Sequence, residues 1–386
     1  MKLLFDASEL TPVSAKSVGI YRYALGLFSE MVRQCGPDDH VALVCNGDNL
    51  ADFQRRLAPG RVTVVCIQPR MPGHFWRQWW MRLGAALCLR RMGAEAYLSP
   101  KGFIPRRTAW PRGVARVAVI HDLIPFWYFK QWPGYFGRME SWLVSGAFEH
   151  AFRRADRLIA ISEETGRALA EHGVPSRRVS VVLNGVDTAE DEVEAVRSDL
   201  PSGVEGRFIF AMASGLPHKN QQGVLAAYAA YRRLAGTRAL PLVLCGASDV
   251  QQGGVLSVGR VSDKALLALY RYADLFVFLS LMEGFGYPPI EALRVGTPVL
   301  CSDLGVLKEV TGGLAYHVAP QAAEEAAQAM HRLCDAPWTL SQREVLRTQA
   351  HHRITSELSW ERCADGVWQA LRQGVAATKA SMQEQA

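Results

Sequence analysis

The sequence predicts an α/β protein with two wound parallel sheets, one in each half of the chain. Short apolar runs of strand length alternate with stretches of helical periodicity almost throughout, which is typical of parallel sheets covered by helices. The alternation pauses at residues 184–206 and then restarts, so we expect two Rossmann-like domains of similar size. Open parallel sheets bind ligands beyond the carboxyl ends of their strands, and we expect the two sheets to face an interdomain cleft.

Each half has its own set of expected elements. In the first half, strands are expected at residues 2–5, 41–45, 62–67, 117–120 and 158–161, and helices at 21–34 and 135–155. In the second half, strands are expected at 208–213, 242–245, 275–279 and 299–301, and helices at 222–235, 263–273, 289–295 and 360–373.

The pause in the pattern sets the predicted domain boundaries. It contains the string NGVD, an acidic run and then the string PSG, a composition typical of a connecting segment. We expect a first domain at 1–188, a linker at 189–206, a second domain at 207–358, and at 359–386 a helix that packs back on the first domain, followed by a tail.

Composition and charge bound the class of protein. The chain has 386 residues, of which 49% are hydrophobic and 21% charged, an ordinary globular composition with enough apolar residues for a sizeable core. The net charge of +6 favours partners that carry phosphate, either nucleic acid or an anionic membrane surface. The eight cysteines are scattered without a C-x-x-C pair, which favours buried free thiols over disulfides or a zinc site.

The N-terminus and the hydropathy of the chain predict a cytoplasmic protein. The first apolar run ends at Asp6, well short of the apolar core of a signal peptide. We find no stretch near the roughly 20 apolar residues that span a bilayer. The expected localisation is therefore the cytoplasm, with peripheral contact to the inner face of the plasma membrane as a further expectation.

The segment from Ser280 to Leu293 carries the strongest chemical signal. It reads SLMEGFGYPPIEAL and follows a strand-like apolar run, so glycines form a tight loop that leads into a helix begun by two prolines. Glu283 and Glu291 lie on either side of this loop, where two carboxylates can accept hydrogen bonds from sugar hydroxyls. The alternative is that Glu283 is a loop carboxylate and Glu291 stabilises the first turn of the helix.

Three further segments place polar residues or glycine after expected strands. In ASGLPHKN, Lys219 can neutralise a negative charge, or it is a solvated loop lysine. In VAVIHDLIP, His121 can form a hydrogen bond with a hydroxyl, or it caps a turn. In SVGIYRY, Gly19 can allow the backbone to approach a ligand closely, although a lone glycine is weak evidence.

These segments together resemble the retaining GT-B glycosyltransferases of family 4, also called glycosyl transferases group 1. The string E-G-F-G-x-P-x-x-E-A resembles their E-x7-E signature, H-K-N their R-K-N loop, H-D-x-x-P their acceptor-side segment and G-I-Y-R-Y their G-I-G-R-Y loop. His218 stands where arginine is usual, and Tyr21 replaces the second glycine of the last motif. The resemblance is strong over residues 205–312, moderate over 115–187 and weak over 46–110.

The resemblance implies roles for the two domains and for these residues. The domain at 1–188 would bind the acceptor, and the domain at 207–358 would bind the nucleotide sugar. Lys219 would neutralise the departing phosphate, His121 would position the acceptor hydroxyl, and the backbone at Gly19 would approach the donor phosphates. Glu283 would lie near the donor sugar, Glu291 would hold the nucleotide ribose, and Lys219 and His121 would join Glu283 as catalytic residues. The implied donor-binding residues are Gly19, His218, Lys219, Asn220, Glu283, Gly284, Phe285, Gly286, Tyr287 and Glu291.

The resemblance also implies an activity. The expected enzyme is a retaining hexosyltransferase that moves a sugar from a nucleoside diphosphate to a glycan or a lipid-linked saccharide, in the synthesis of cell-surface polysaccharide or lipopolysaccharide. GDP-mannose is the favoured donor, because the motifs are most similar to those of bacterial mannosyltransferases. No cofactor and no essential metal are expected, since the sequence has no Asp-x-Asp motif.

Two other functions remain open at this point. A non-catalytic module would keep the fold and bind a sugar nucleotide or a protein, and the histidine in place of arginine at position 218 leaves that alternative open. A nicotinamide-dependent oxidoreductase would need a G-x-G-x-x-G string after the first strand, and the sequence lacks it.

A tryptophan-rich segment lies in the region of weakest resemblance. The string HFWRQWWMR at 74–82 places Phe75, Trp76, Trp79 and Trp80 among arginines. Amphipathic aromatic residues beside cations suit a membrane interface, and we expect this segment to contact anionic lipid near a lipid-linked acceptor. The alternatives are a core helix with solvated arginines, or nucleic-acid binding through stacking, although we expect no nucleic acid as a partner.

Overall fold

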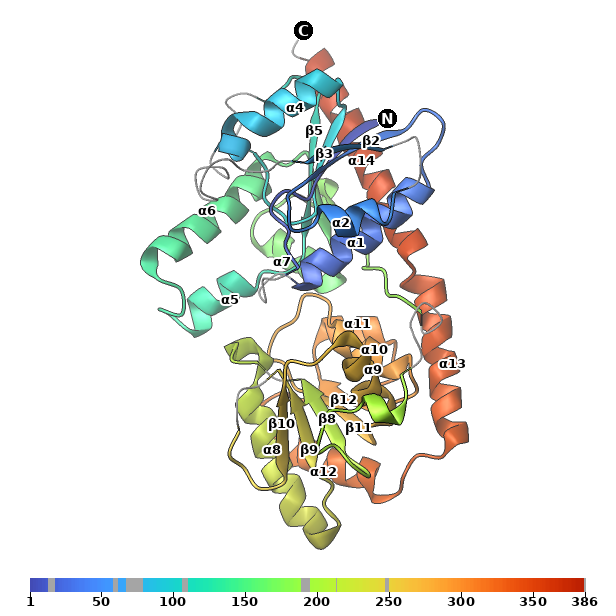
Figure 1. Cartoon of the computed structure of the whole chain (residues 1–386). Helices are drawn as coiled ribbons and strands as arrows, with labels where there is room; N and C mark the ends of the chain where they lie inside the picture. The colour runs from blue at the N-terminus through green and yellow to red at the C-terminus, as the bar shows by residue number, and fades with distance from the viewer. Residues whose placement is uncertain are drawn as a thin grey trace. The chain divides into compact units, whose positions relative to one another are not determined.

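The computed structural model describes residues 1–12, 18–57, 62–66, 79–105, 110–188, 195–212, 214–246 and 250–384 (Figure 1). The chain divides into two compact units. The first comprises Met1–Gly185 together with Ser359–Ala386, and the second comprises Val186–Leu358. The first six residues of the predicted linker, 189–194, lie outside the described residues, and its described remainder belongs to the second unit.

The first unit is built on a seven-stranded parallel sheet of order β3-β2-β1-β4-β5-β6-β7. Its strands are β1 (Lys2–Asp6), β2 (His40–Cys45), β3 (Val62–Cys66), β4 (Ala96–Ser99), β5 (Ala115–Ile120), β6 (Arg157–Ala160) and β7 (Val179–Val181). The central strands β1, β4 and β5 are buried along nearly their whole length. Continuous apolar runs of this kind arise when helices cover both faces of a sheet.

Helices cover both faces of this sheet because alternate strand residues point to opposite sides. Leu4 lies in a buried cluster with Leu89 and Phe148, whereas its neighbour Phe5 packs edge-on against Phe28 at 5.2 Å between ring centroids. The helices are α1 (Val18–Arg33), α2 (Leu50–Gln54), α4 (Ala85–Met92), α5 (Ile124–Gln131), α6 (Arg138–Arg154) and α7 (Glu163–Glu171). A π-helical turn at Trp80–Gly84 runs directly into α4.

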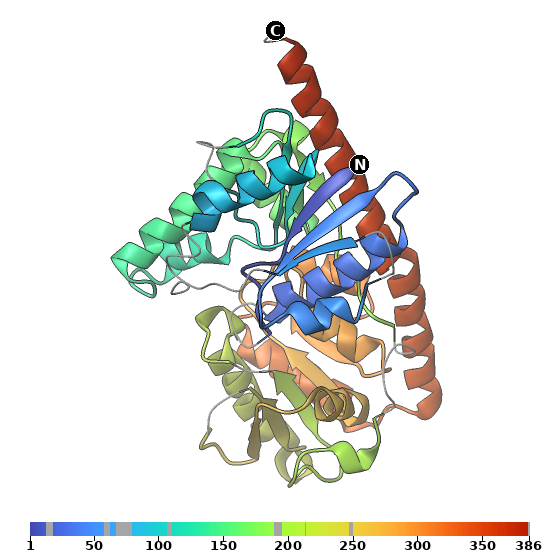
Figure 2. The same ribbon diagram turned by 45° about the horizontal axis from the view of Figure 1, so that its top comes forward.

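The last helix of the chain, α14 (Trp360–Gln383), belongs to the first unit and packs against α1 and strands β4, β5 and β6 (Figure 2). Its first residue fits between two glycines. A side-chain carbon at Gly26 or at Gly185 would collide with the Trp360 ring. The absence of side chains at these two positions therefore lets the tryptophan anchor the start of the helix.

The second unit is built on a six-stranded parallel sheet of order β10-β9-β8-β11-β12-β13. Its strands are β8 (Ile209–Met212), β9 (Leu242–Cys245), β10 (Val255–Gly259), β11 (Leu275–Phe278), β12 (Val299–Ser302) and β13 (Tyr316–Val318). Its helices are α8 (Gln221–Ala235), α9 (Asp263–Tyr272), α10 (Tyr287–Leu293), α11 (Gly305–Thr311), α12 (Ala323–Asp335) and α13 (Leu340–Glu357). Helices α8 and α12 share one buried cluster with strands β8, β9 and β11.

The predicted α/β class with two parallel sheets is confirmed. Some element bounds were wrong. The helix expected at 135–155 begins only at Arg138, and a separate helix α5 precedes it. The helix expected at 360–373 continues to Gln383. Strands β4, β7, β10 and β13 were not expected.

Within the part of the chain that the structure describes, all eight cysteines are free, and six of them are buried. No helix within the described ranges is long and apolar enough to cross a lipid bilayer.

Candidate active site

Two loops of the second unit follow neighbouring strands and lie side by side. Strands β8 and β11 pair in parallel, so the segments after Met212 and Phe278 leave the same edge of the sheet. The backbone N–H of Leu281 donates to the carbonyl of His218 at 2.7 Å. This hydrogen bond holds the loop that carries Lys219 against the loop that carries Glu283.

Lys219 and Glu283 form an ion pair between these two loops. Lys219 Nζ lies 2.7 Å from Glu283 Oε1, and the same ammonium lies 5.4 Å from the centre of the Phe278 ring. The Glu283 side chain is buried, whereas that of Lys219 keeps 27% of its surface exposed. A lysine at such a partly open site can exchange its carboxylate partner for a phosphate, which accepts similar charge-assisted hydrogen bonds.

Asn220 shapes the turn that carries Lys219. Its backbone is left-handed, with a φ of 53°, a conformation that asparagine tolerates better than most residues. Its side-chain amide donates to the carbonyls of Leu279 at 2.8 Å and Pro320 at 2.9 Å. Its side-chain oxygen accepts from the N–H of Gly223 and so caps α8. Asn220 thus positions Lys219 through the backbone, and its expected contact with a donor stays a prediction.

His218 occupies the place where the family motif usually has arginine, and it is buried. Burial, together with the neighbouring charge of Lys219, lowers the pKa of His218 to about 4. The imidazole is therefore neutral at pH 7, and position 218 supplies no second positive charge beside Lys219.

The loop between Glu283 and α10 turns sharply at a position that requires glycine. Gly286 has a φ of +91°, and a side-chain carbon there would collide with Leu307. Phe285 is buried, and its ring lies 4.8 Å from that of Tyr287 at the first position of α10. Gly284 is buried as well. This packing fixes the path of the chain from Glu283 to Glu291.

Glu291 lies on α10 and is half-buried. The hydroxyl of Tyr270, from α9, donates to Met212 Sδ at 3.1 Å, and burial together with the nearby charge of Glu291 raises the pKa of Tyr270 well above its usual value. Directly after α10, Arg294 Nη1 donates to the backbone carbonyl of Asp187 at 2.7 Å. Neither Tyr270 nor Arg294 was expected as a site residue from the sequence.

In the first unit, His121 follows β5 at the carboxyl edge of the sheet. Its Nε2 lies 2.7 Å from the carbonyl oxygen of Pro100. Since a carbonyl only accepts, Nε2 carries the hydrogen and Nδ1 holds the lone pair of the neutral ring. The ring also meets Tyr23 edge-on at 4.9 Å, and burial lowers the pKa of His121 to about 4. His121 thus presents a neutral acceptor nitrogen at pH 7.

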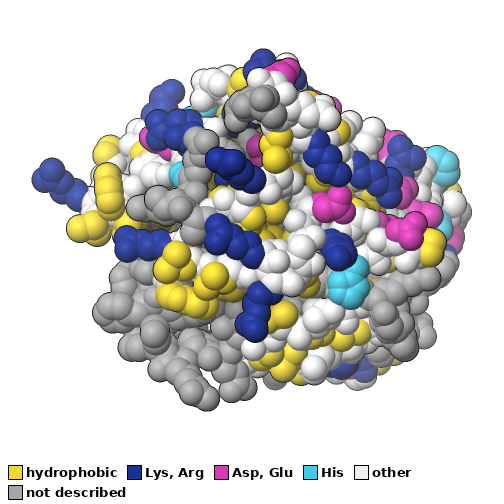
Figure 3. Space-filling model, turned by 90° about the horizontal axis from the view of Figure 1, so that it is seen from above, with side chains coloured by type: hydrophobic (Ala, Val, Ile, Leu, Met, Phe, Trp, Pro, Cys, Tyr) yellow, Lys and Arg dark blue, Asp and Glu magenta, His cyan; other side chains and the backbone are white. Residues whose placement is uncertain are grey.

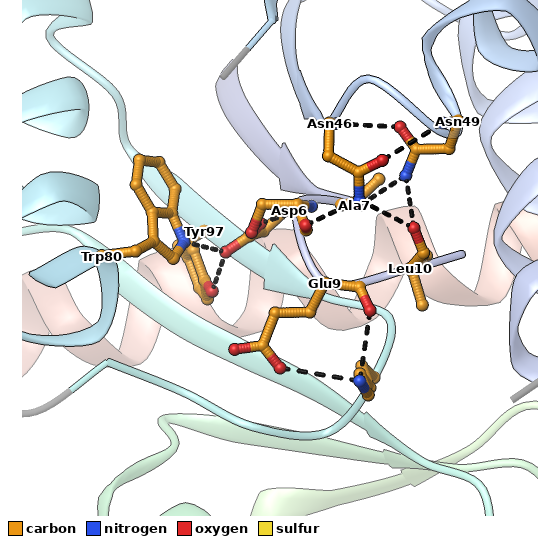
Figure 4. A network of polar contacts seen from close by, with 10 residues as sticks. Asp6, Ala7, Glu9, Leu10, Asn46, Asn49, Trp80 and Tyr97 are labelled. Atoms are coloured by element: carbon orange, nitrogen blue, oxygen red, sulfur yellow. Dashed lines mark hydrogen bonds and ion pairs between the residues drawn. The ribbon is translucent and has the colours of Figure 1, made fainter. Parts of the chain in front are cut away.

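The buried carboxylate of Asp6 lies at the same edge of the sheet in the first unit and accepts several hydrogen bonds (Figure 4). Asp6 Oδ1 accepts from the N–H and the hydroxyl of Ser8 at 3.0 and 2.6 Å. Asp6 Oδ2 accepts from Trp80 Nε1 at 2.7 Å and from the Tyr97 hydroxyl at 2.6 Å. Burial raises the pKa of the Asp6 carboxyl, and these donors oppose that rise.

Two asparagines hold the loop that follows Asp6. The side-chain amides of Asn46 and Asn49 both donate to the carbonyl of Leu10 at distances of 2.9 and 2.8 Å (Figure 4). On the same loop Glu9 lies 3.6 Å from Lys101, which follows β4. These contacts hold the loop in place as far as Leu10.

Gly19 lies in the first turn of α1, and a side-chain carbon there would meet no atom of the other described segments within 4 Å. Packing against these segments therefore does not require glycine at this position.

The tryptophan-rich segment is described only from residue 79 onward. Phe75, Trp76 and Arg77 lie outside the described residues. Trp80 is a core residue bonded to Asp6, whereas Trp79 is exposed. The core alternative therefore holds for Trp80, and the expectation that Trp80 contacts lipid was wrong.

Within the described ranges, no group of three or more His, Cys, Asp or Glu residues could hold a metal ion.

The two parallel-sheet units and the known structures they resemble define the GT-B fold of glycosyltransferases. The model for Glycosyltransferase Family 4 matches residues 19–190, and the model for Glycosyl transferases group 1 matches residues 192–353. The chain belongs to this family of glycosyltransferases.

Curated relatives include two bacterial mannosyltransferases. The serotype-specific mannosyltransferase WbdA of Escherichia coli is 30% identical over 220 residues, which cover 51% of this chain and 26% of WbdA. The O-antigen chain mannosyltransferase RfbU of Salmonella typhimurium is 25% identical over 235 residues, which cover 58% of this chain and 62% of RfbU. The matched part of this chain thus spans about a quarter of WbdA.

Among solved structures, HepE of Anabaena in complex with UDP and glucose aligns with a TM-score of 0.65. The alignment covers 96% of this chain and 99% of HepE, at 17% sequence identity. Similarity at this identity supports the fold alone.

Proposed function

We propose that this protein is a retaining glycosyltransferase that moves a hexose from a nucleoside-diphosphate sugar to a glycan or a lipid-linked saccharide. The observation that carries the proposal is the Lys219–Glu283 ion pair, which joins the loops after β8 and β11 at the carboxyl edge of the second sheet. A cation and a carboxylate at such an edge match the two ends of a sugar diphosphate, its phosphates and its hydroxyls.

The donor would bind through charge and hydroxyl contacts in the second unit. Lys219 would leave Glu283 to bind the diphosphate and would stabilise the charge that grows as the sugar departs. Glu283, released from the pair, would accept from hydroxyls of the sugar. Glu291 would accept from the ribose hydroxyls.

The acceptor hydroxyl would be positioned by His121 in the first unit. A neutral ring with Nε2–H bound to Pro100 leaves Nδ1 as the atom that accepts the hydrogen bond of the attacking hydroxyl. The low pKa of His121 argues against it as the final proton acceptor, so the leaving phosphate takes the proton. The hydroxyl attacks the anomeric carbon from the face that the diphosphate leaves, which retains the configuration.

Mannose is the proposed sugar, and GDP-mannose the proposed donor. The printed functions of WbdA and RfbU, both mannosyltransferases, support this choice. HepE is bound to UDP and glucose, so UDP-glucose is the necessary comparison. The RfbU description, an O-antigen chain mannosyltransferase, also supports a place in cell-surface polysaccharide or lipopolysaccharide synthesis at the cytoplasmic face of the membrane.

A panel of nucleotide sugars tests the proposal. The purified chain is incubated with GDP-mannose, UDP-glucose and related donors, and release of nucleoside diphosphate is measured with and without a glycan acceptor. We expect release from GDP-mannose without added metal, and a product whose new linkage has the anomeric configuration of the donor by NMR. Absence of turnover with every donor, or inversion of configuration, would overturn the proposal.

A non-catalytic GT-B module is the second candidate function. It is favoured by His218, which is buried and neutral where the family motif has a cation. Such a module would bind a nucleoside diphosphate in a calorimetric titration but would release none from any sugar nucleotide. The same panel therefore separates the two functions.

A further inference from the structure

Helix α6 is apolar on two opposite faces. Its buried face includes Phe148 and Phe152. Met139, Trp142 and Leu143 recur at i, i+3 and i+4 spacing and project from the other side of the helix, where between 49% and 70% of each side chain is exposed. A surface helix of a globular protein normally has polar residues on its outer face, so this face has the composition of a covered surface.

The helical segment that leads into α4 has the same property. Trp79, Leu83 and Leu87 recur at every fourth position, and between 42% and 51% of each is exposed. The opposite side of the segment carries Trp80 and Leu89, which are buried.

These two exposed faces lie on the same side of the first unit. The buried sides of α4 and α6 enter one hydrophobic cluster that covers a single face of the sheet, with Leu89 and Phe148 among its members. The outer sides of both helices therefore face away from that side of the sheet. We call the set Trp79, Leu83, Leu87, Met139, Trp142 and Leu143 the outer apolar face.

Basic side chains surround the outer apolar face. Residues 79–92 contain Arg82, Arg90 and Arg91, all exposed, and no acidic residue. Of the two acidic residues of α6, Glu149 lies 2.7 Å from Arg153 and is neutralised by it. In Figure 3, on the side where α6 lies in Figure 1, dark-blue basic side chains alternate with yellow apolar ones, while most magenta acidic side chains lie on the other side of the view.

We propose that the outer apolar face docks on the surface of an anionic lipid bilayer. Tryptophan prefers the interface between lipid and water, and arginines beside it are attracted to anionic headgroups. A second copy of this chain fits the face less well. A twofold interface would place the face against itself and would bring its arginines near those of the partner.

This inference is independent of the chemistry in the second unit and deepens the proposed function only in its acceptor. An enzyme docked by its first unit would act on a saccharide that is anchored in lipid. Binding to vesicles requires no donor and no turnover, so docking and glycosyl transfer fail separately.

Flotation of the full chain with vesicles tests the docking. Vesicles of phosphatidylcholine alone are compared with vesicles that also contain phosphatidylglycerol. We expect at least about tenfold stronger binding to the anionic vesicles at low salt, since each arginine near the surface contributes about fivefold. Binding should fall at 1 M salt, where the screening length is about 3 Å.

A triple variant examines the apolar part of the face. Met139→Gln, Trp142→Gln and Leu143→Gln together should weaken vesicle binding by about tenfold or more, because exposed apolar side chains lose their contact with the interface. The matched control is Leu340→Gln with Val345→Gln, which changes two exposed apolar residues of the second unit and should leave vesicle binding unchanged. Since all five residues are exposed, both variants should keep the circular dichroism and melting temperature of the wild type.

Three results would overturn the docking proposal. The first is that the wild type does not float with anionic vesicles at low salt. The second is that the triple variant and the control variant bind the vesicles equally well. In the third, gel filtration would show a wild-type dimer that the triple variant converts to a monomer, which would assign the face to a second copy. The triple variant should still transfer the sugar to a water-soluble acceptor. If neither the wild type nor the triple variant does so, the result contradicts the proposed function and leaves the docking proposal standing.

Discussion

The two units hold their polar site residues in different ways. In the second unit, two side chains of opposite charge face each other, with Lys219 Nζ 2.7 Å from Glu283 Oε1. In the first unit, His121 is neutral and bound to a backbone carbonyl, and Asp6 is enclosed by donors from three residues. The second unit thus holds charged groups that can exchange partners, whereas the polar groups of the first unit have fixed partners.

This difference separates two kinds of contribution to a transfer reaction. A lysine at a partly exposed site can bind phosphate as well as carboxylate, so under the proposed function the second unit would respond to a diphosphate. A neutral imidazole held by a carbonyl does not change its charge near pH 7, so the first unit can orient a hydroxyl without competing for its proton.

The largest effect is expected at Lys219. Lys219→Ala should lower turnover by about 10²-fold or more, the usual loss when one donor that stabilises transition-state charge is removed. Steady-state kinetics with the preferred donor measure it. The matched control is Lys264→Ala, an exposed lysine of the same unit that is paired with Asp199, and it should retain full activity. Equal activity of both variants would remove Lys219 from the site.

A large effect on stability is expected at Asp6. Each of its oxygens faces one N–H that cannot turn away, from Ser8 on one side and from Trp80 on the other. An asparagine would set its own N–H group against one of them in either orientation. We expect Asp6→Asn to lower the free energy of unfolding by about 3 kcal/mol, measured by chemical denaturation.

Two variants calibrate the Asp6 result. Trp80→Phe removes a single donor and should cost about half as much, whereas Asp38→Asn, at an exposed position, should change nothing. If Asp6→Asn is as stable as the wild type, the first unit does not depend on the buried carboxylate.

The two buried histidines should make the free energy of unfolding depend on pH, and we expect this effect to be of intermediate size. Burial lowers the pKa values of His121 and His218 to about 4, below the value of about 6.5 in an unfolded chain. The unfolded chain therefore binds more protons between pH 6.5 and pH 4. Their contribution to stability is complete above pH 6.5 and is lost as the pH falls toward 4, which denaturation at several pH values will show.

His121→Gln isolates one of the two histidines. The glutamine amide can still donate to the Pro100 carbonyl, but it does not titrate and has no atom in place of Nδ1. Its stability should depend less on pH than that of the wild type, while transfer to the acceptor should fall and donor binding should stay the same. Wild-type transfer by this variant would contradict the role of Nδ1.

The smallest effect on the protein itself is expected at Gly19. An alanine side chain would meet no atom of the other described segments within 4 Å, and alanine favours a helix over glycine by about 1 kcal/mol. Gly19→Ala should therefore be as stable as the wild type or slightly more so. A fall in kcat/KM without loss of stability would show that a ligand approaches this backbone closely, and unchanged kinetics would show that none does.

The sequence predicted those parts of the site that are encoded locally. Gly286 and the prolines after it specify a turn into a helix whatever surrounds them, because a positive φ and a proline at the first turn are local requirements. The motif around Glu283 and Glu291 was visible for this reason. Lys219 was singled out from its loop after a strand and from the resemblance of that loop to the R-K-N motif, and its role in the site stays a prediction.

Contacts between distant segments could not be predicted. The donors to Asp6 from Trp80 and Tyr97 come from 74 and 91 residues further along the chain. Tyr270 reaches Glu291 from another helix. No spacing in a single sequence specifies such pairs, since they depend on how helices pack on the sheet. Asp6 itself was noted only as the residue that ends an apolar run.

The strands that the sequence analysis missed are short or lie at the edges of the sheets. β7, β10 and β13 are edge strands, and their partly exposed residues lack the continuous apolar run of a buried strand. β4 is central, but its apolar run is interrupted by Glu95 on one side and ends at Ser99 and Pro100 on the other. Continuity of the apolar run, rather than position in the sheet, decided which strands could be recognised.

Calorimetric titration of Glu291→Ala with GDP and UDP tests the donor site of the second unit most directly. The variant keeps the Lys219–Glu283 pair and removes only the proposed ribose contact, so binding of the preferred nucleotide should weaken by roughly 10- to 150-fold, the equivalent of 1.5–3 kcal/mol for a hydrogen bond to a charged group. Glu324→Ala, at an exposed glutamate paired with Arg233 in the same unit, should bind as the wild type does. Wild-type affinity of Glu291→Ala for both nucleotides would contradict the assignment of this site.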